Sequence, residues 1–238
     1  MNEKIEQLKR WIEESDNIVF FGGAGVSTES GIPDFRSKDG LYNIEYDYPP
    51  EEILSHFFFI NNTKEFYRFY KDKMNSLKYE PNITHYKLAD LEKRGKVKAV
   101  VTQNIDGLHQ KAGSKVVYEL HGSVRRNYCI SCKKFYDGEY IFSSEDIPKC
   151  ECGGIIKPDV VLYGEGLDNE TVENAIKAIK ESDMLIVGGT SLTVYPASGL
   201  INYYKGNKLV LINRDETSFD RKANLVINNS LGDVFKNL

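Results

Sequence analysis

Polar residues of the kinds that bind ligands and move protons follow two apolar runs of this sequence. Gln103, Asn104 and Asp106 lie within four residues of the end of one run, VKAVVT. His121 comes shortly after the other run, KVVYE. If both runs are strands of a parallel sheet, these side chains meet at its carboxyl edge, where ligands bind. An imidazole titrates near neutral pH, so His121 is a candidate general base; the alternative is a structural histidine beside a simple turn.

A glycine-rich segment, GGAGVST (22–28), follows a third apolar run, IVFF. A glycine turn between a strand and a helix exposes backbone N–H groups that can bind a diphosphate, and a Cβ there would keep the phosphate away. Compared with the pattern G-x-G-x-x-G, Gly23 and Gly25 match, but Thr28 occupies the third position. This loop alone therefore indicates a tight turn as readily as a phosphate site.

Two further strand ends carry groups suited to a dinucleotide. The run 208–212 leads to Asn213, and the run 184–188 leads to Thr190 and Ser191. A dehydrogenase of the usual kind would place an acidic residue ~20 positions after the glycine turn, at the end of the next strand. Here no second strand follows within that reach. The three loops together predict a dinucleotide site with non-standard connectivity.

The cysteines form a C-x2-C pair and a C-x-C pair with 17 residues between them: Cys129, Cys132, Cys150 and Cys152. Clustered thiols in a reducing compartment favour a metal over disulfides. Four thiolates on two turns predict a closed tetrahedral zinc site of structural type, because a catalytic zinc keeps an open position. The second pair is one residue shorter than the usual C-x2-C, and unligated cysteines are the alternative.

The remaining pattern describes the elements that must position these groups. Short apolar runs alternate with helical patterns, and this alternation predicts an α/β fold with a parallel sheet covered on both faces. Residues 40–80 are rich in aromatic and charged residues and indicate a helical excursion from the sheet. The predicted strands are 18–21, 97–102, 115–119, 184–188, 208–212 and 225–228, and the predicted helices are 3–14, 85–94, 169–181 and 195–204.

Charge and composition exclude several classes of protein. The 238 residues carry 31 Lys and Arg against 35 Asp and Glu, a net charge of −4. Binding to nucleic acid or acidic membranes needs excess positive charge, so neither partner is expected. No apolar run approaches the ~20 residues that cross a bilayer, and charges interrupt the first residues where a signal peptide would need an apolar core. We expect a soluble, cytoplasmic protein.

Several motifs occur together and in order: GAGVSTESGIPDFR (23–36), TQNID (102–106), LHG (120–122), PDVVLYGE (158–165) and GTSL (189–192), with the four cysteines between the third and fourth. In this combination the sequence resembles the sirtuins, NAD-dependent protein lysine deacylases, over nearly the whole chain. The resemblance implies a Rossmann-like parallel sheet domain with a small inserted zinc-ribbon and helical domain. It divides the chain into an NAD-binding part (1–39, 82–123 and 158–238), a helical insert (40–81) and a zinc-binding module (124–157).

The resemblance also implies roles for individual residues. His121 would be the base and would also contact NAD. Asn104, the second catalytic residue, would contact the reacting ribose together with Gln103. Phe35, Ile105 and Asp106 would surround nicotinamide, and Val161 and Tyr163 would line the acyl-lysine tunnel with Phe35. The residues that would hold the ADP-ribose part are Ala24, Thr28, Arg36, Thr190, Ser191, Asn213 and the backbone at Leu231.

The implied reaction consumes NAD. The amide oxygen of acetyl-lysine attacks C1′ of the ribose as nicotinamide leaves, and Asp106 accepts hydrogen bonds from the departing carboxamide. Phe35 excludes water, and His121 then removes a proton so that the ribose 2′ oxygen attacks the bound amide. The products would be lysine, nicotinamide and O-acetyl-ADP-ribose. The implied partners are proteins that carry acetyl-lysine, and we expect a monomer.

One departure concerns the acyl group. Relatives that prefer succinyl- or malonyl-lysine carry Tyr-x-x-Arg where this chain has Tyr67 and Tyr70. Without the arginine a buried carboxylate would be costly, so we expect deacetylation rather than desuccinylation. The alternative is that both tyrosines are core residues and that Arg68 turns inward.

Three other functions compete with this interpretation. A hydride-transferring NAD oxidoreductase would change the redox state of the nicotinamide. A zinc-ribbon binding module would leave the polar residues at the strand ends without a purpose, and residues 125–150, with five basic and four acidic side chains, form no basic patch. A mono-ADP-ribosyltransferase would share the nicotinamide-cleaving step, but labelled NAD would leave its label on protein.

Overall fold

A six-stranded parallel sheet forms the larger part of the computed structural model, which describes residues 2–34 and 47–238. Its spatial order is β3-β2-β1-β7-β8-β9, so the chain builds outward from β1 in one direction and then in the other. Ligands bind at the carboxyl edge near such a reversal. The strands are β1 (Ile18–Gly22), β2 (Val97–Thr102), β3 (Val117–Glu119), β7 (Met184–Gly188), β8 (Leu209–Asn213) and β9 (Leu225–Asn228).

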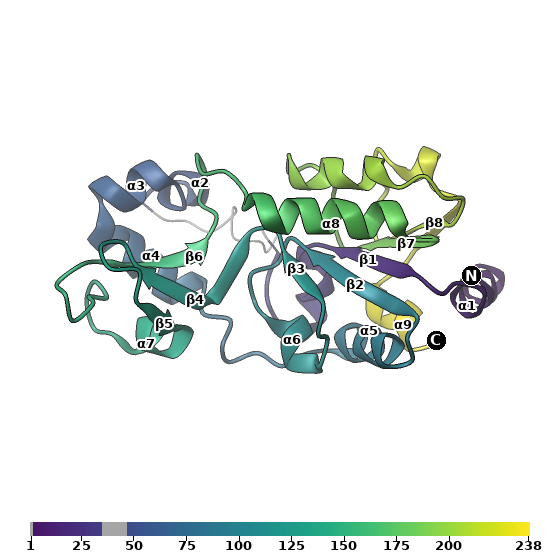
Figure 1. The fold of residues 1–238 in the computed structure, drawn as a ribbon, viewed down its shortest axis with the longest axis horizontal. Helices are drawn as coiled ribbons and strands as arrows, with labels where there is room; N and C mark the ends of the chain where they lie inside the picture. The colour runs from purple at the N-terminus through teal and green to yellow at the C-terminus, as the bar shows by residue number, and fades with distance from the viewer. Residues whose placement is uncertain (1, 35–46) are drawn as a thin grey trace.

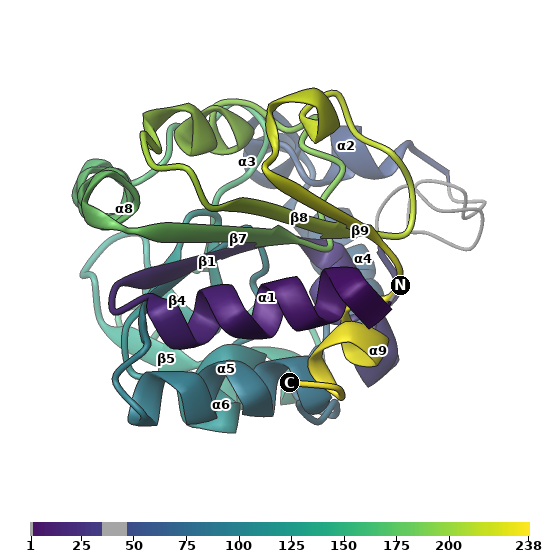
Figure 2. The same cartoon turned by 90° about the vertical axis from the view of Figure 1, so that its right-hand side faces the viewer.

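Helices cover both faces of this sheet (Figures 1 and 2). One face carries α1 (Asn2–Glu14), α5 (Ile83–Lys93), α6 (Leu108–Ala112) and α9 (Leu231–Phe235), and the other carries α8 (Asn169–Glu181) and a 3₁₀ helix, η4 (Ala197–Tyr203). Alternate residues of β1 explain the two layers. Ile18 and Phe20 pack with the first group, whereas Val19 and Phe21 pack with the second. Because both faces are buried, β1 reads as a continuous apolar run.

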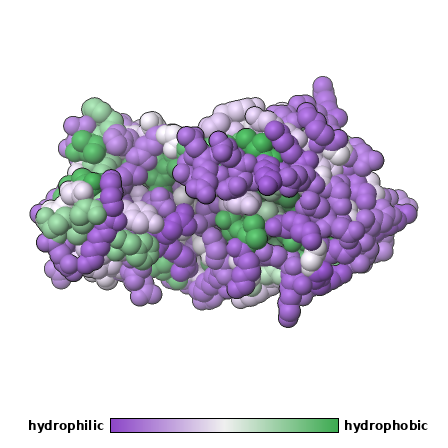
Figure 3. All heavy atoms as spheres, in the orientation of Figure 1, coloured by the Kyte–Doolittle hydropathy of each residue, from purple (hydrophilic) through white to green (hydrophobic). Residues whose placement is uncertain are grey.

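A smaller part holds the cysteines and the helical insert, on the left of Figure 1. Its antiparallel sheet has the order β5-β4-β6. Phe58 and Phe66 of the insert share one core with Val124 and Cys129 of the sheet. In Figure 3 hydrophobic surface is visible at this end, where α3 is found. The elements are α2 (Pro50–Ile53), α3 (His56–Asn61), α4 (Thr63–Lys73), β4 (Gly122–Cys129), β5 (Phe135–Asp137), α7 (Gly138–Ser143) and β6 (Ile156–Val160).

The predicted strands and helices are present, with two differences in helix type. Residues 195–204, predicted as a helix, form the 3₁₀ helix η4, and the helix expected after the glycine loop is replaced by two short 3₁₀ turns. Pro196 is the residue just before the first of these segments, a position where the missing N–H of proline costs no helical hydrogen bond. The short 3₁₀ turns are η1 (Ala24–Val26), η2 (Thr28–Ser30) and η5 (Asp220–Lys222).

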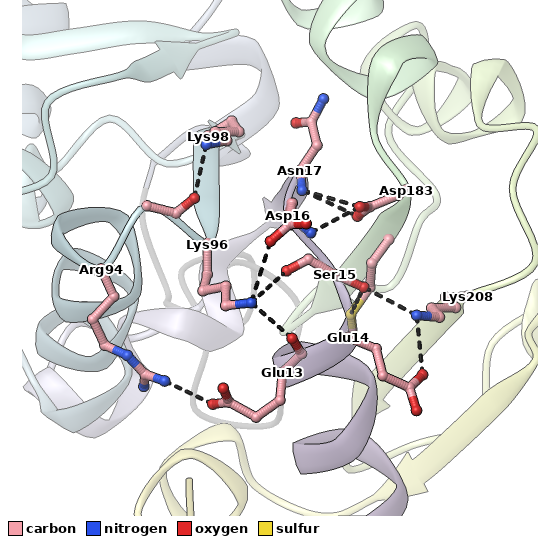
Figure 4. A network of polar contacts seen from close by, with 12 residues as sticks. Glu13, Glu14, Ser15, Asp16, Asn17, Arg94, Lys96, Lys98, Asp183 and Lys208 are labelled. Carbon is pink, nitrogen blue, oxygen red and sulfur yellow. Dashed lines mark hydrogen bonds and ion pairs between the residues drawn. The ribbon is translucent and has the colours of Figure 1, made fainter.

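A polar network fixes the opposite, amino-terminal edge of the sheet (Figure 4). Lys96 donates from Nζ to the carbonyl oxygens of Glu13 (2.7 Å) and Ser15 (3.0 Å) and so satisfies the end of α1. The carboxylate of Asp183 accepts hydrogen bonds from the backbone N–H groups of Asp16 (2.8 Å) and Asn17 (3.2 Å). These contacts lock the start of β1 against β2 and β7.

Two buried histidines lie on helices that cover one face of the parallel sheet. His85 on α5 and His109 on α6 have ring centroids 4.7 Å apart, and both are almost fully buried. Burial lowers the pKa of His85 to about 4. Burial and the neighbouring His85 lower the pKa of His109 well below its ordinary value. Both rings are therefore neutral in the folded protein at neutral pH.

We expect the free energy of unfolding to fall as pH drops from 6.5 toward 4. The unfolded chain protonates both histidines near pH 6.5, whereas the folded chain does not, so their contribution is complete above that pH and is lost below it. For His85 alone the full loss, reached below pH 4, is about 3 kcal/mol, of which about 2 kcal/mol is already lost at pH 5. Urea unfolding at pH 7.5 and pH 5 measures it. A double variant, His85→Gln with His109→Gln, should show a flatter dependence, and an unchanged slope would contradict this assignment.

Candidate active site

A cavity of about 640 Å³ lies at the carboxyl edge of the parallel sheet, between the two parts of the molecule. It collects the loops after β1, β2, β7 and β8 with the start of β4 and the segment after β6. Phe35 and Arg36 lie outside the described residues. The predicted site residues that line the cavity are Ala24, Thr28, Gln103, Asn104, Ile105, Asp106, His121, Val161, Tyr163, Thr190, Ser191, Asn213 and Leu231.

The glycine loop is packed directly against the loop after β7. Gly25 donates its N–H to the carbonyl oxygen of Gly189 at 2.8 Å. A Cβ on Gly25 would lie 2.8 Å from the Cα of Gly189, and a Cβ on Gly23 would lie 2.7 Å from the Cβ of Thr190. The sequence suggested that these glycines admit a phosphate. The structure adds a second reason, since they let two backbone loops touch.

Side-chain amides tie the neighbouring loops together. Asn213 donates from Nδ2 to the carbonyl oxygen of Thr190 (2.9 Å) and accepts the N–H of Thr190 at Oδ1 (3.1 Å). Gln103 donates from Nε2 to the hydroxyl of Thr190 at 3.1 Å. The ends of β2, β7 and β8 are thus fixed relative to one another, and the loops form a preorganised edge of the cavity.

Asp106 is a buried carboxylate with several hydrogen-bond donors. Ser27 donates from Oγ to Oδ2 of Asp106 at 2.7 Å and accepts from Nδ2 of Asn104 at 3.1 Å, while the N–H of Leu108 donates to Oδ1 at 2.8 Å. Arg125 donates from Nε to the backbone carbonyl of Asp106. Burial raises the pKa of Asp106, and these hydrogen bonds and the Arg125 charge oppose the rise. The result is a rigid acceptor inside the cavity.

His121 is oriented as a base. Its Nδ1 lies 2.9 Å from the carbonyl oxygen of Gln103. Because a carbonyl oxygen only accepts, Nδ1 carries the proton and the neutral ring keeps its lone pair on Nε2. Burial lowers the pKa of His121, although the bond to Gln103 opposes the shift. The neutral form is therefore favoured at neutral pH, and the ring can take a proton from a hydroxyl bound in the cavity.

Gly122 and Val161 hold His121 between β4 and β6. Gly122 has a left-handed backbone conformation (φ +76°), and a Cβ there would collide with the carbonyl oxygen of Asp159. The N–H of Val161 donates to the carbonyl oxygen of His121 at 3.0 Å. The glycine of the LHG motif is thus needed for the close approach of two strands beside the imidazole.

The segment after β6 closes into a turn over residues 162–165, which we call the substrate turn. The backbone N–H of Tyr163 donates to Leu54 and its carbonyl oxygen accepts from the N–H of His56, both at 2.9 Å. Val161 also uses its N–H within the chain, so the backbone group that it could offer to a ligand is its carbonyl oxygen. The ring of Tyr163 is partly exposed at the cavity.

The four cysteine thiols form one cluster in the small part of the molecule. All four sulfur atoms lie within 4.8 Å of one another, and Cys129–Cys152 and Cys132–Cys150 are 3.5 Å apart. Tetrahedral zinc with Zn–S of about 2.3 Å requires sulfur atoms about 3.8 Å apart, so the donor set fits. Although the C-x-C pair is one residue shorter than C-x2-C, both of its thiols lie in the cluster. No cysteine is among the described residues that line the cavity, which fits a structural metal.

The aromatic helix α4 points its tyrosines into the core of the small part. Tyr67 donates its hydroxyl to the carbonyl oxygen of Ile156, and Tyr70 is fully buried. Arg68 faces outward and pairs with Glu65 and Asp47. A cation that sequence analysis missed, Lys73, does line the cavity, where its Nζ lies 2.9 Å from Asp72.

Ser27 and Arg125 were also missed. Ser27 sits within the glycine motif, where no strand or helix pattern assigns a direction to its side chain. Arg125 was counted only as one of the basic residues of the cysteine region. Both contact Asp106 through tertiary packing across long stretches of sequence.

Comparison with known proteins identifies close relatives of this arrangement. A sequence model described as the Sir2 family matches residues 23–196. A protein of Clostridium acetobutylicum named NAD-dependent protein deacetylase is 61% identical, covering 98% of this chain and 97% of its own. One of the same name from Clostridium perfringens is 59% identical, covering 98% of both chains.

Solved structures agree in shape. A Sir2 protein with a p53 peptide and NAD⁺ has a TM-score of 0.86 at 40% identity, covering 98% of this chain and 95% of the other. A Sir2 protein bound to acetylated peptide also has a TM-score of 0.86, at 39% identity and with the same coverage. Among the described residues, no helix is long and apolar enough to span a bilayer.

Proposed function

The chain belongs to the Sir2 family, and from this premise we propose that NAD and an acetyl-lysine side chain react in the cavity at the carboxyl edge of the sheet. The protein is an NAD-dependent protein deacetylase. It transfers the acetyl group of acetyl-lysine to ADP-ribose and releases nicotinamide, and its partners are proteins that carry acetyl-lysine. The proposal concerns which residues perform these steps.

The loops after β1, β7 and β8 would hold the ADP-ribose part. Their mutual hydrogen bonds support this, because a preorganised edge loses little entropy when the dinucleotide binds. The contacts would come from Ala24, Thr28, Thr190, Ser191, Asn213 and the backbone at Leu231, with Arg36 from the segment outside the described residues.

Asp106 would accept hydrogen bonds from the carboxamide of nicotinamide, next to Ile105 and with Phe35 excluding water. Gln103 and Asn104 would contact the reacting ribose. After the amide oxygen has attacked C1′ and nicotinamide has left, His121 would remove a proton from the ribose hydroxyls through Nε2, so that the 2′ oxygen attacks the carbon of the bound amidate. The carbonyl of Gln103 stabilises the imidazolium that forms, since it keeps the proton on Nδ1. Val161 and Tyr163 would line the acyl-lysine channel.

A zinc ion held by the four cysteines would support folding of the small part and take no step in the reaction. We also propose the division into an NAD-binding part (1–39, 82–123 and 158–238), a helical insert (40–81) and a zinc-binding module (124–157). Separate cores for the sheet and for the small part support it. We propose a cytoplasmic monomer that binds no nucleic acid: thiol ligands persist in a reducing compartment, and one chain supplies all the described residues that line the cavity.

One observation carries the assignment of residues. His121, with its tautomer fixed by Gln103, shares a single cavity with the buried carboxylate of Asp106. Mass spectrometry of the products from NAD and an acetyl-lysine peptide tests the reaction. We expect nicotinamide, deacetylated peptide and O-acetyl-ADP-ribose in equal amounts. Label from NAD on protein would support ADP-ribosyl transfer, and intact or reduced NAD would exclude the proposal.

We expect acetyl-lysine to be a better substrate than succinyl-lysine on the same peptide, by about tenfold or more in kcat/KM. Tyr67 and Tyr70 are packed in the core and Arg68 faces outward, so none of them offers a cation to an acyl carboxylate. The free energy of burying an unpaired carboxylate is less favourable than that of burying a methyl group by at least several kcal/mol. Steady-state rates on the two peptides measure the preference. Faster desuccinylation would contradict it and would implicate Lys73, which Lys73→Met would then test.

A further inference from the structure

The carboxylate of Glu165 joins three segments of the small part beside the cavity. Its Oε1 lies 2.8 Å from Nδ1 of His56, which begins α3. Its Oε2 lies 3.0 Å from Nζ of Lys157 on β6 and accepts the backbone N–H of Leu162 at 2.9 Å. A single side chain thus connects the helical insert, the antiparallel sheet and the substrate turn.

Glu165 also closes the substrate turn on itself. Its backbone N–H donates to the carbonyl oxygen of Leu162 at 2.9 Å, while its side chain accepts the N–H of the same residue. Gly164 supplies the left-handed conformation (φ +89°) that a turn of this shape requires. Both polar backbone groups of Leu162 are therefore satisfied by one residue, and the orientation of the turn depends on the Glu165 carboxylate.

The charge environment keeps this carboxylate ionised. Burial alone would raise the pKa of Glu165, but hydrogen bonds from Leu162 and His56 and the charge of Lys157 hold it below its ordinary value. Glu165 and Lys157 are each about one-fifth exposed (20% and 22% of the side chain). Charge-assisted bonds at such partly buried sites are stronger than those of exposed ion pairs.

The turn in turn positions the residues that face the acyl-lysine. Tyr163 lies inside it, and Val161 precedes it and donates to the carbonyl oxygen of His121. A change in the orientation of the turn would displace Tyr163 first. It would reach the dinucleotide loops only indirectly, because these are fixed by Thr190 and Asn213 on the other wall.

We propose that Glu165 is a positioning residue for the peptide substrate: it fixes the substrate turn in the orientation that presents Val161 and Tyr163 to the acyl-lysine side chain. This inference rests on the proposed function. It assigns Glu165 to peptide binding and to neither NAD binding nor the chemical step.

Steady-state kinetics of the full-length zinc-loaded protein with an acetyl-lysine peptide test the assignment. For Glu165→Ala we expect KM for the peptide to rise by about tenfold or more, as the loss of charge-assisted hydrogen bonds implies, with KM for NAD within about twofold of wild type. Glu165→Gln keeps an acceptor for Leu162 and should recover part of the loss. His56→Ala should raise the peptide KM by less, and should add little in the Glu165→Ala background, because both changes break one network.

Glu65→Ala is the matched control. It also removes a paired carboxylate from the helical insert, but its partner is Arg68 on the outer face. Both KM values should stay at wild type. An unchanged peptide KM in Glu165→Ala would overturn the proposal, as would an equal loss in both KM values with a lower melting temperature in both Glu165 variants. Failure of the proposed function would give another result: the wild-type protein itself would release no nicotinamide when incubated with NAD and the peptide.

Discussion

Replacing His121 with alanine is expected to lower the rate of deacetylation by about a thousandfold while NAD binds nearly as tightly as to wild type. The imidazole, part-buried in the cavity wall, is the base that we propose, and its Nε2 carries the lone pair because Nδ1 donates to Gln103. NAD affinity should survive, since the loops that would hold ADP-ribose are fixed by contacts that do not involve His121. Single-turnover product formation and calorimetric titration with NAD measure the two quantities.

His121→Gln is the matched control for this experiment. A glutamine can still donate to the carbonyl of Gln103 but cannot act as a base near neutral pH. It should be as inactive as alanine while retaining the melting temperature of wild type. Undiminished turnover in either variant would remove His121 as the base, and loss of NAD binding in both would assign it to the dinucleotide site.

Removing the metal is expected to unfold the small part while the parallel sheet stays folded. Four thiols held 3.5 to 4.8 Å apart lose the ion that links their two turns. Structural zinc contributes on the order of 10 kcal/mol to folding in small zinc domains. Because Cys129 and Cys150 share a core with the aromatic residues of α3 and α4, the helical insert should loosen together with β4, β5 and β6.

Hydrogen exchange with and without a chelator measures this effect element by element. Amides of β4 and α4 should lose protection, whereas those of β1 and β7 should keep it. Cys150→Ser should bind less than one zinc per chain, and Glu151→Gln, which changes an exposed neighbour paired with Lys134, should bind one. A metal-free protein with wild-type protection throughout would show that the site is not structural.

The sheet could be predicted because its strands are buried on both faces. A segment such as 18–21 has no polar residue to confuse its pattern, and the helix 169–181 was predicted with its true bounds because Asp168 caps a strongly amphipathic segment. The three strands of the smaller sheet were not predicted from the sequence. β4 mixes Ser123, Arg125 and Asn127 with apolar residues and follows no simple alternation.

The site was predictable to the extent that strand ends determine it. Parallel strands bring their carboxyl ends together, so Gln103, Asp106 and His121 could be placed at one edge from sequence. Contacts between side chains that are far apart in the sequence could not be predicted in this way. The bond from Ser27 to Asp106 and the three contacts of Glu165 depend on how separate loops pack, and no local spacing encodes them.

The contact between Gly25 and Gly189 has a consequence for biosynthesis. β1 lies between β2 and β7, so the first strand to leave the ribosome waits for one of its neighbours until most of the polypeptide has been translated. Until then the nascent chain has an unpaired strand edge next to its glycine loop, an arrangement that invites aggregation. The cavity at the carboxyl edge is consequently among the last features of the molecule to form, and a truncated translation product that stops before β7 would lack it.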